Sequence, residues 1–301
     1  MEKGYIMSIF LFEYAVGSNE DIEPNILQEG KLMFDRLLED FLNSNFTVIT
    51  VIGEKHLEYY RDRDNLKVYV QRNTDVIETI KEVLNRENIE GALLIAPESD
   101  GLLYRLTKLI EERNILNLGS HSEGVKIGGN KYLTYERIKG VVKTPKTLPP
   151  KRYIIKEIEG CGGSNQLIIS ENYIVQEHIE GEPYSASFIV GKKLYPLSLN
   201  RQYYKDGKYI GGGINIDHPL KDRMIEESMK ALKEIEGLNG YVGVDILLKG
   251  DDIYILEINP RITTSIVGIY TTPSISQLLV DNAKGKDLKY RVEGSREITI
   301  L

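Results

Sequence analysis

Short apolar runs alternate with amphipathic stretches from Ile6 to about Ser120. The apolar runs are Ile6–Phe12, Thr47–Ile52, Ala92–Ala96 and Leu116–Leu118, and the amphipathic stretches are Ile26–Leu42, Val76–Asn85 and Leu102–Arg113. Short strands that alternate with helices are typical of a parallel sheet covered on both faces, so we expect a Rossmann-like layered lobe. No Gly-x-Gly-x-x-Gly links the first strand to the first helix, and the pattern therefore does not indicate a dinucleotide site.

The pattern changes near the middle of the chain. Asn130–Lys139 has the spacing of a short helix, and Lys143–Pro150 then breaks the periodicity with two successive prolines. The short strands that follow are Tyr153–Lys156, Gln166–Ile169, Tyr173–His178 and Ala186–Val190. Because tight turns separate them, they predict a small antiparallel sheet from residue 150 to about residue 195.

The last third of the chain mixes helices with a β-hairpin. Helices are predicted at Arg223–Glu236 and near Ile275–Asn282, with the hairpin at Tyr241–Asn259 between them. The sequence thus predicts an α/β lobe at residues 1–125 and two α+β lobes. These are a central lobe at 126–195, with a linker helix and a glycine-rich loop, and a C-terminal lobe at 196–301.

Composition narrows the chemistry. The 301 residues include one cysteine, Cys161, and four scattered histidines, so we expect no intramolecular disulfide and no Cys/His zinc site. The net charge of −7 disfavours a surface that binds nucleic acid. No apolar run approaches the roughly 20 residues of a membrane span, and Met1–Met7 lacks the pattern of a secretory signal. We therefore expect a cytoplasmic protein whose metal, if any, is held by oxygen.

The strongest candidate for chemistry is the hairpin that carries Asp245, Glu257 and Asn259. Side chains alternate faces along a strand, so Glu257 and Asn259 point the same way, and a short turn brings Asp245 opposite them. Carboxylates among Ile, Leu and Tyr residues are costly to bury unless a cation compensates them. Two acids and an amide oxygen suit magnesium that also contacts phosphates. The alternative is that both acids line a solvated face of the hairpin.

A second candidate is a glycine-rich loop after a strand that ends near Lys156. The loop contains Gly160, Gly162, Gly163 and Ser164. Its backbone N–H groups could close over phosphate oxygens beside the lysine, and Lys131 of the preceding helix offers another contact. No Walker A sequence occurs, and similar loops also connect ordinary hairpins.

Two further regions carry polar residues where ligands are often bound. Gln176, Glu177, His178, Ile179 and Glu182 form an edge strand and turn that could pair with an adenine edge and ribose hydroxyls, or could be an exposed charged strand.

Glu13 and Glu98 follow predicted strands of the first lobe. Open sheets bind ligands at this edge, although such residues also serve as helix caps.

In this order the motifs resemble the ATP-grasp superfamily, in which two α+β lobes clamp ATP behind a Rossmann-like first domain. The most specific part is the set Asp245, Glu257 and Asn259, followed by Pro260-Arg261. The resemblance spans almost the whole chain. It implies ATP as a cofactor, with magnesium or manganese at those three residues.

The same resemblance assigns further contacts residue by residue. Lys131 and Lys156 match two lysines that contact ATP phosphates, and Gln176–Ile179 occupies the hinge that reads adenine. Glu182 would contact the ribose, although many members place this acid at the position of Pro183.

Three stretches are most similar to the archaeal ligases that join tyramine to the γ-carboxylate of L-glutamate in methanofuran biosynthesis. They are Phe12–Gly17, Ala96–Gly101 and Glu257–Ser265. This resemblance implies an amide formed through an acyl phosphate, with ADP and phosphate as products.

A mechanism follows as an expectation. Arg261 and Lys156 would act on the transferring phosphoryl group, because a guanidinium suits planar oxyanions. An ion pair between Arg261 and a neighbouring acid is the alternative. Candidates for substrate contact are Glu13 and Glu98, for an ammonium group, Arg201, for an α-carboxylate, and Thr264.

Other functions stay open. The chain could use another amino acid, a cofactor tail or a purine precursor, or it could be a regulatory protein that binds ATP without catalysis. The intact metal set and Arg261 favour an enzyme with small-molecule substrates. The sequence leaves a homo-oligomer open.

Overall fold

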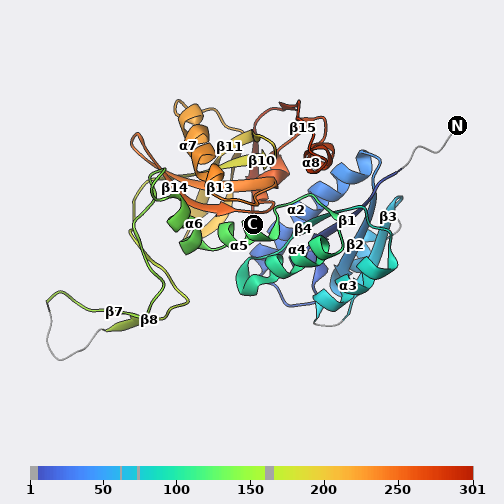
Figure 1. Ribbon diagram of the computed structural model, residues 1–301, viewed down its shortest axis with the longest axis horizontal. Coiled ribbons are helices and arrows are strands. Elements are labelled where there is room, and N and C mark those ends of the chain that lie inside the picture. The colour runs from blue at the N-terminus through green and yellow to red at the C-terminus, as the bar shows by residue number, and fades with distance from the viewer. Residues whose placement is uncertain (1–5, 62, 73–74, 160–165, 301) are drawn as a thin grey trace.

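The computed structural model describes residues 6–61, 63–72, 75–159 and 166–300. Two lobes, each built on a sheet, form the body of the molecule, and a narrow hairpin projects from it (Figure 1). Gly160, Gly162, Gly163 and Ser164 of the predicted phosphate loop lie outside the described residues, as does Cys161.

The first lobe contains a five-stranded parallel sheet with the order β3-β2-β1-β4-β5. Its strands are β1 (Ser8–Glu13), β2 (Thr47–Gly53), β3 (Leu66–Gln71), β4 (Gly91–Ile95) and β5 (Leu116–Asn117). Its helices are α1 (Tyr14–Gly17), α2 (Pro24–Asn43), α3 (Val76–Arg86) and α4 (Leu102–Glu112), with 3-10 turns η1 (Glu54–Tyr60) and η2 (Ser99–Gly101). The predicted Rossmann-like layering is confirmed.

Alternation along β1 explains why helices cover both faces of this sheet. Ile9 and Leu11 pack with α2 residues in one core, whereas Phe10 and Phe12 pack with α3 and α4 residues in another. All four side chains are fully buried. Because successive residues of a strand point to opposite faces, an unbroken apolar run can occupy the middle of such a sheet.

The second lobe contains a six-stranded sheet with the order β14-β13-β10-β11-β12-β17. Its strands are β10 (Glu182–Val190), β11 (Leu194–Lys205), β12 (Lys208–Ile214), β13 (Gly240–Lys249), β14 (Asp252–Asn259) and β17 (Arg296–Thr299). Helix α7 (Lys221–Lys233) covers one face, where its Met224 and Leu232 share a core with Phe188 and Val244. On the opposite face, Ile189 and Tyr241 join the core that contains α2, and the serines of β10 are buried beside them.

One strand prediction was wrong. Ala186–Val190 does not belong to a small sheet with the strands before it, because β10 pairs along its whole length with β13. Seven consecutive residues from Tyr184 are buried, and an apolar strand of this kind is most stable in the interior of a large sheet.

The short strands of the middle segment instead form two separate pairs. These are β6 (Thr147–Leu148) with β9 (Val175–Gln176), and β7 (Tyr153–Ile155) with β8 (Leu167–Ile169). The β7–β8 pair is the hairpin that projects from the body in Figure 1.

The remaining elements connect the lobes or complete the second one. They are α5 (Ser122–Gly128), α6 (Lys131–Ile138), η3 (Thr264–Gly268), β15 (Thr271–Thr272), α8 (Ile275–Ala283) and β16 (Arg291–Val292). The predicted helices and the hairpin of the C-terminal segment are present. No helix in the described ranges is long and apolar enough to cross a membrane.

Helix α2 packs against both lobes. Its Phe34 and Leu37 share a single apolar core with Ile266 and Leu278 of the second lobe. Its polar side adds a hydrogen bond across the same boundary, in which Arg36 Nη2 donates to the Ile269 carbonyl at 3.0 Å. The two lobes are thus joined by a continuous core as well as by their connecting chain.

The close approach of α5 to the turn after α7 gives a prediction about stability. A Cβ added at Gly124 would lie 2.3 Å from the carbonyl carbon and oxygen of Gly237, a distance that only a backbone shift can relieve. We expect Gly124→Ala to lower the free energy of unfolding by about 1–3 kcal/mol, as overpacked sites do. Denaturant titration measures this. Gly140→Ala is the control, because nothing lies within 4 Å of its added Cβ; equal effects of the two changes would contradict the prediction.

Candidate active site

The hairpin of β13 and β14 brings the predicted metal-binding residues together. Asp245 pairs with Glu257, and Gly243 with Asn259, so the two acids and the amide share one end of the hairpin. Asn259 Nδ2 donates to Asp245 Oδ2 at 3.1 Å, and Gln202 Nε2 donates to Asp245 Oδ1 at 3.0 Å. Glu257 forms an ion pair with Lys131 of α6. The pairing shifts register directly after Asp245, as strands often do beside functional sites.

This donor set can hold a divalent cation. It offers two carboxylates and one side-chain amide oxygen, which hard cations prefer. Burial raises the pKa of Asp245, so its charge is costly there without a compensating cation. The described residues contain no group of three or more His, Cys, Asp or Glu side chains arranged for a metal. A site here would therefore depend on the amide and on ligands from the substrate.

Two cavities meet at Asp245. One, of about 370 Å³, is lined by Lys131, Gln176, Pro183 and Glu257. The other, of about 170 Å³, is lined by Glu29, Tyr209, Arg261, Thr264 and others. Gln202, Tyr204 and Asp245 line both cavities. A group transferred between molecules bound in the two cavities would pass beside Asp245.

Arg261 forms an ion pair with Glu98. Its Nε and Nη2 donate to the two oxygens of Glu98 at 2.8 and 3.1 Å, a bidentate contact across 163 residues of chain. Both side chains are about one-quarter exposed or less. Arg261 also lines the smaller of the two cavities, so the ion pair holds the guanidinium at its edge. Glu98, expected to receive an ammonium group, has both oxygens engaged by Arg261.

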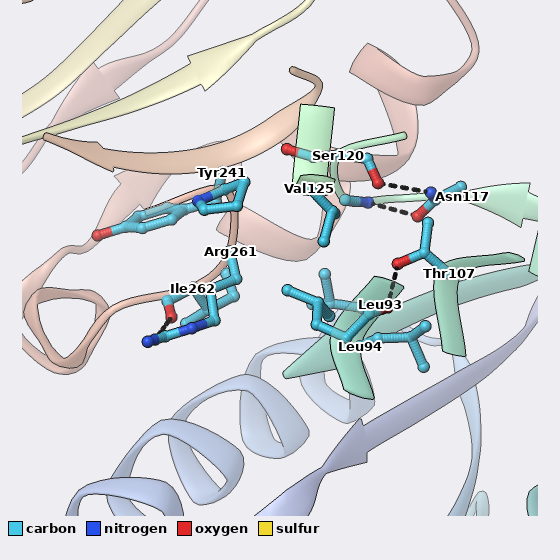
Figure 2. A pocket seen from close by; sticks show the side chains of 12 residues that line it. Leu93, Leu94, Thr107, Asn117, Ser120, Val125, Tyr241, Arg261 and Ile262 are labelled. Carbon is cyan, nitrogen blue, oxygen red and sulfur yellow. Dashed lines mark hydrogen bonds between the residues drawn. The ribbon is translucent and has the colours of Figure 1, made fainter. Parts of the chain in front are cut away.

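Figure 2 shows another cavity beside Arg261, between the lobes. It is lined by Leu93, Val125, Tyr241 and Ile262 among others, and its volume is about 10 Å³. That is about the space that one water molecule needs, so no substrate fits it.

Glu13 lies at the end of β1 but is not accessible. Its side chain is 5% exposed and accepts a hydrogen bond from the Val16 N–H at 2.8 Å, so it caps α1. A Cβ on Gly30 of α2 would lie 2.7 Å from both carboxylate oxygens. Burial raises the pKa of Glu13 from 4.5 to about 7. Backbone hydrogen bonds and the charge of Arg261 lower the pKa, but their effect is smaller than that of burial. The capping interpretation therefore describes its position better than substrate contact does.

This raised pKa predicts how stability depends on pH. The folded protein binds the Glu13 proton more tightly than the unfolded chain does, so stability falls as pH rises from about 4.5 to about 7 and is then level. The loss corresponds to about 3 kcal/mol. Glu13→Gln keeps an acceptor for Val16 and removes the charge, so its stability relative to the unchanged protein should rise by that amount between pH 4.5 and pH 8. Denaturant titrations at both values measure it.

Glu112→Gln, at the exposed end of α4, is the control and should show no such trend. A pH dependence of Glu13→Gln that matches the unchanged protein would contradict the prediction.

The two lysines predicted to contact the phosphates of the nucleotide lie in different parts of the structure. Lys131 lines the larger cavity directly. Lys156 follows β7 on the projecting hairpin, where its side chain is exposed, so the structure does not bring it to Asp245 (Figure 1). The neighbouring Ile158 is fully exposed, and Ile154 and Leu167 of the same hairpin are more than half exposed.

The predicted hinge begins on β9. Gln176 lines the larger cavity and donates from Nε2 to Thr147 Oγ1 at 2.8 Å. The N–H of Glu177 donates to the carbonyl of Lys146 at 2.8 Å. Glu177 and His178 are exposed, and Ile179 is partly buried in the irregular segment before β10.

Glu182 and Arg201 are not brought to the cavities. Tyr184 pairs with Arg201 across β10 and β11, and Tyr184 belongs to the core beneath α7. Arg201 Nη2 donates to Glu182 Oε2 at 2.8 Å on that same face. The alternation of side chains instead places Pro183, Gln202 and Asp245 on the cavity face. The sequence-based assignments of Glu182 to ribose and of Arg201 to a substrate carboxylate are therefore corrected.

Sequence reasoning missed Glu29. It lies near the start of α2, and Thr264 Oγ1 donates a hydrogen bond to its Oε2 in the smaller cavity. A polar residue on an amphipathic helix usually faces solvent, and no local motif marks this one. Thr264, which was predicted, is thus found in the cavity through its contact with α2.

The chain is similar to known proteins along most of its length. A family model described as an ATP-grasp domain matches residues 128–265, and a pre-ATP-grasp domain model matches residues 53–125. The chain is 49% identical over 292 residues to a tyramine–L-glutamate ligase of Methanocaldococcus jannaschii, covering 97% of this chain and 94% of that protein. It is 50% identical to the ligase of the same name from Methanocaldococcus fervens, covering 97% and 99%. A crystal structure titled as an ATP-grasp superfamily protein from Archaeoglobus fulgidus matches with a TM-score of 0.75 and 32% identity, covering 97% and 92%.

Proposed function

The chain belongs to the ATP-grasp superfamily, within the family of the tyramine–L-glutamate ligases that it matches along 97% of its length, and from that premise we propose its reaction. It is an ATP-dependent carbon–nitrogen ligase that joins L-glutamate to tyramine. The observation that carries this is identity of about one half with two such ligases over nearly their whole length.

The reaction proceeds in two parts in the two cavities that meet at Asp245. ATP binds in the larger cavity, with its phosphates near Lys131 and its base near Gln176. The γ-carboxylate of glutamate attacks the γ-phosphate, so that an acyl phosphate and ADP form. The amine then attacks the acyl carbon from the smaller cavity and releases phosphate. Holding the reactants beside one another supplies much of the rate enhancement.

Asp245, Glu257 and Asn259 would hold the divalent cation, which we propose to be magnesium. Bound there, the cation would neutralise charge on the phosphates. Lys131 is already paired with Glu257, which places an ammonium group beside the same oxygens. Arg261, fixed by Glu98, binds the transferring phosphoryl group at the edge of the smaller cavity.

The projecting hairpin supplies the remaining contacts when it closes. Lys156 directly follows β7 and would reach the phosphates only after the hairpin moves toward the body. Closing would also cover the exposed isoleucines of the hairpin and exclude water from the acyl phosphate. A role for Lys156 is thus proposed for the closed enzyme.

An assay of ADP release tests the proposed function. Protein, ATP and magnesium are incubated with L-glutamate, with and without tyramine, and the product is identified by mass spectrometry. Tyramine-dependent ADP release with a glutamyl-tyramine product is expected. L-norvaline, which lacks the γ-carboxylate, should give no product. ATP binding without any tyramine-dependent turnover would contradict the assignment of substrates, and repeating the assay with manganese shows which cation serves better.

Other predictions from the sequence accompany this proposal. They are a division between lobes near residue 125, a cytoplasmic location, a place in methanofuran biosynthesis and the absence of nucleic acid or membrane partners. None of them alters the test of the reaction. The predicted division near residue 195 is corrected, because β11 runs through it and pairs with β10 in one sheet.

A further inference from the structure

One carboxylate of the smaller cavity has no part in the proposed phosphoryl transfer. Glu29 enters this cavity from α2 in the first lobe, on the other side from the hairpin that carries Asp245. Thr264 Oγ1 donates to Glu29 Oε2 and so fixes the orientation of the carboxylate. Burial raises the pKa of Glu29, although the bond from Thr264 and the charge of Arg261 act against this. Within the part of the chain that the structure describes, no cationic side chain forms an ion pair with Glu29, so its carboxylate can receive a cation from a substrate.

The other two acids on this side of the cavity are engaged elsewhere. Glu13 is 5% exposed and caps α1 beneath Gly30. Glu98 gives both oxygens to Arg261. Of these three carboxylates, only Glu29 lines the cavity that also contains Asp245 and Arg261. It is therefore the acid best placed beside the acyl carbon formed there.

Two tyrosines form an aromatic wall in the same cavity. Tyr204, near the end of β11, and Tyr209, on β12, lie with ring centroids 5.9 Å apart and planes inclined by 65°. Both line the cavity with Glu29. Burial raises the pKa of both phenols, and negative charge adds to this, from Asp245 and then Glu29 at Tyr204 and from Glu29 first at Tyr209. An aromatic ring with a short cationic arm would contact the tyrosines and the carboxylate together.

We propose that Glu29 binds the ammonium group of the amine substrate while Tyr204 and Tyr209 hold its aromatic ring. This rests on the proposed function, which supplies tyramine as the amine. The smaller cavity then selects amines that carry an aromatic ring, and the larger cavity takes the nucleotide. The two substrates of the second step meet beside Asp245.

The same position lets Glu29 take part in the proton transfers. The ammonium group must lose one proton before its nitrogen can attack, and Glu29 accepts that proton. The nitrogen lone pair then forms the C–N bond while the C–O bond to phosphate breaks. Phosphate leaves with the bonding pair and takes the second proton of the nitrogen, so the amide is neutral.

Glu29→Gln tests the ammonium contact by calorimetric titration with tyramine. The amide keeps an acceptor for Thr264 and loses the charge. We expect the Kd for tyramine to rise about 10- to 100-fold, as for the loss of a hydrogen bond to a charged group. The Kd for 4-ethylphenol, which has the ring without the ammonium group, should change less than about twofold. Tyr209→Leu should weaken binding of both molecules.

Steady-state kinetics separates binding from a general loss of structure. In Glu29→Gln the KM for tyramine should rise, while the KM values for ATP and glutamate stay within about twofold. Glu39→Gln, on the same helix and exposed, is the matched control and should change none of these values. Thr264→Val removes the bond but keeps the charge, so its effect on tyramine binding should be much smaller.

An unchanged Kd and KM for tyramine in Glu29→Gln, in an enzyme that makes glutamyl-tyramine, would overturn the inference. The same would follow if 4-ethylphenol binding fell as far as tyramine binding. Absence of tyramine-dependent turnover in the unchanged protein would instead overturn the proposed function, so the two failures are distinguishable.

Discussion

Replacement of Arg261 by lysine is expected to lower the turnover number by about 10²- to 10³-fold, the effect of removing one preorganised donor from a transition state. The guanidinium is held by two hydrogen bonds from its Nε and Nη2 to Glu98, beside the cavity that contains Asp245. An ammonium group carries the same charge but cannot reproduce the planar fork that binds an oxyanion at two points. The KM for ATP should change little, because the adenine and the other phosphate contacts remain.

The partner acid provides the comparison for this prediction. Glu98→Gln weakens the same ion pair but leaves the guanidinium in place, so it should reduce stability about as much as Arg261→Lys and reduce turnover far less. Arg223→Lys, on the exposed side of α7, controls for loss of a guanidinium elsewhere. If Glu98→Gln and Arg261→Lys lowered turnover equally, the ion pair would be structural and Arg261 would have no direct part in phosphoryl transfer.

Asp245→Asn is expected to lower ADP formation by about 10³-fold or more, because the cation would lose its central carboxylate. Asp245 lines both cavities and accepts hydrogen bonds from Gln202 and Asn259. Without metal, the variant should be at least as stable as the unchanged protein, since a partly buried carboxylate is costly when nothing cationic compensates it. Thermal unfolding with and without magnesium and ATP measures both effects.

The two proteins should respond differently to ligand. Magnesium with ATP should raise the Tm of the unchanged protein, because it binds only the folded state, and raise that of Asp245→Asn much less. Asp252→Asn, at the exposed turn of the same hairpin, is the matched control and should respond as the unchanged protein does. An equal rise in Tm and unchanged turnover in Asp245→Asn would place the cation elsewhere.

The parts of the site that could be predicted from the sequence depend on local geometry. Asp245, Glu257 and Asn259 lie on one hairpin, so strand alternation and a short turn were enough to bring them together. The first lobe was predictable for a similar reason, because its strands and helices alternate along the chain. The three site residues lie within 14 positions of one another, and each element of the first lobe follows from its own local pattern.

The parts that failed depend on pairings between distant strands. Whether Glu182 or Pro183 faces the cavity is decided by the pairing of β10 with β13, about 60 residues further along the chain, and a shift of one residue reverses every face. The contact of Arg261 with Glu98 spans 163 residues, and that of Thr264 with Glu29 spans 235. No periodicity in the sequence reports such contacts.

The sharing of α2 by both lobes has a consequence for how the chain is made. Ser276 donates its backbone N–H to Asp40 at 2.7 Å, and these two residues are 236 positions apart. A ribosome that adds about 5–20 residues per second needs roughly ten seconds or more to synthesise that interval. During this time the side of α2 that later packs on α8 lacks its partner, so the nascent first lobe presents an uncovered apolar strip. Synthesis must reach α8 before the earliest long helix of the protein has its complete surroundings.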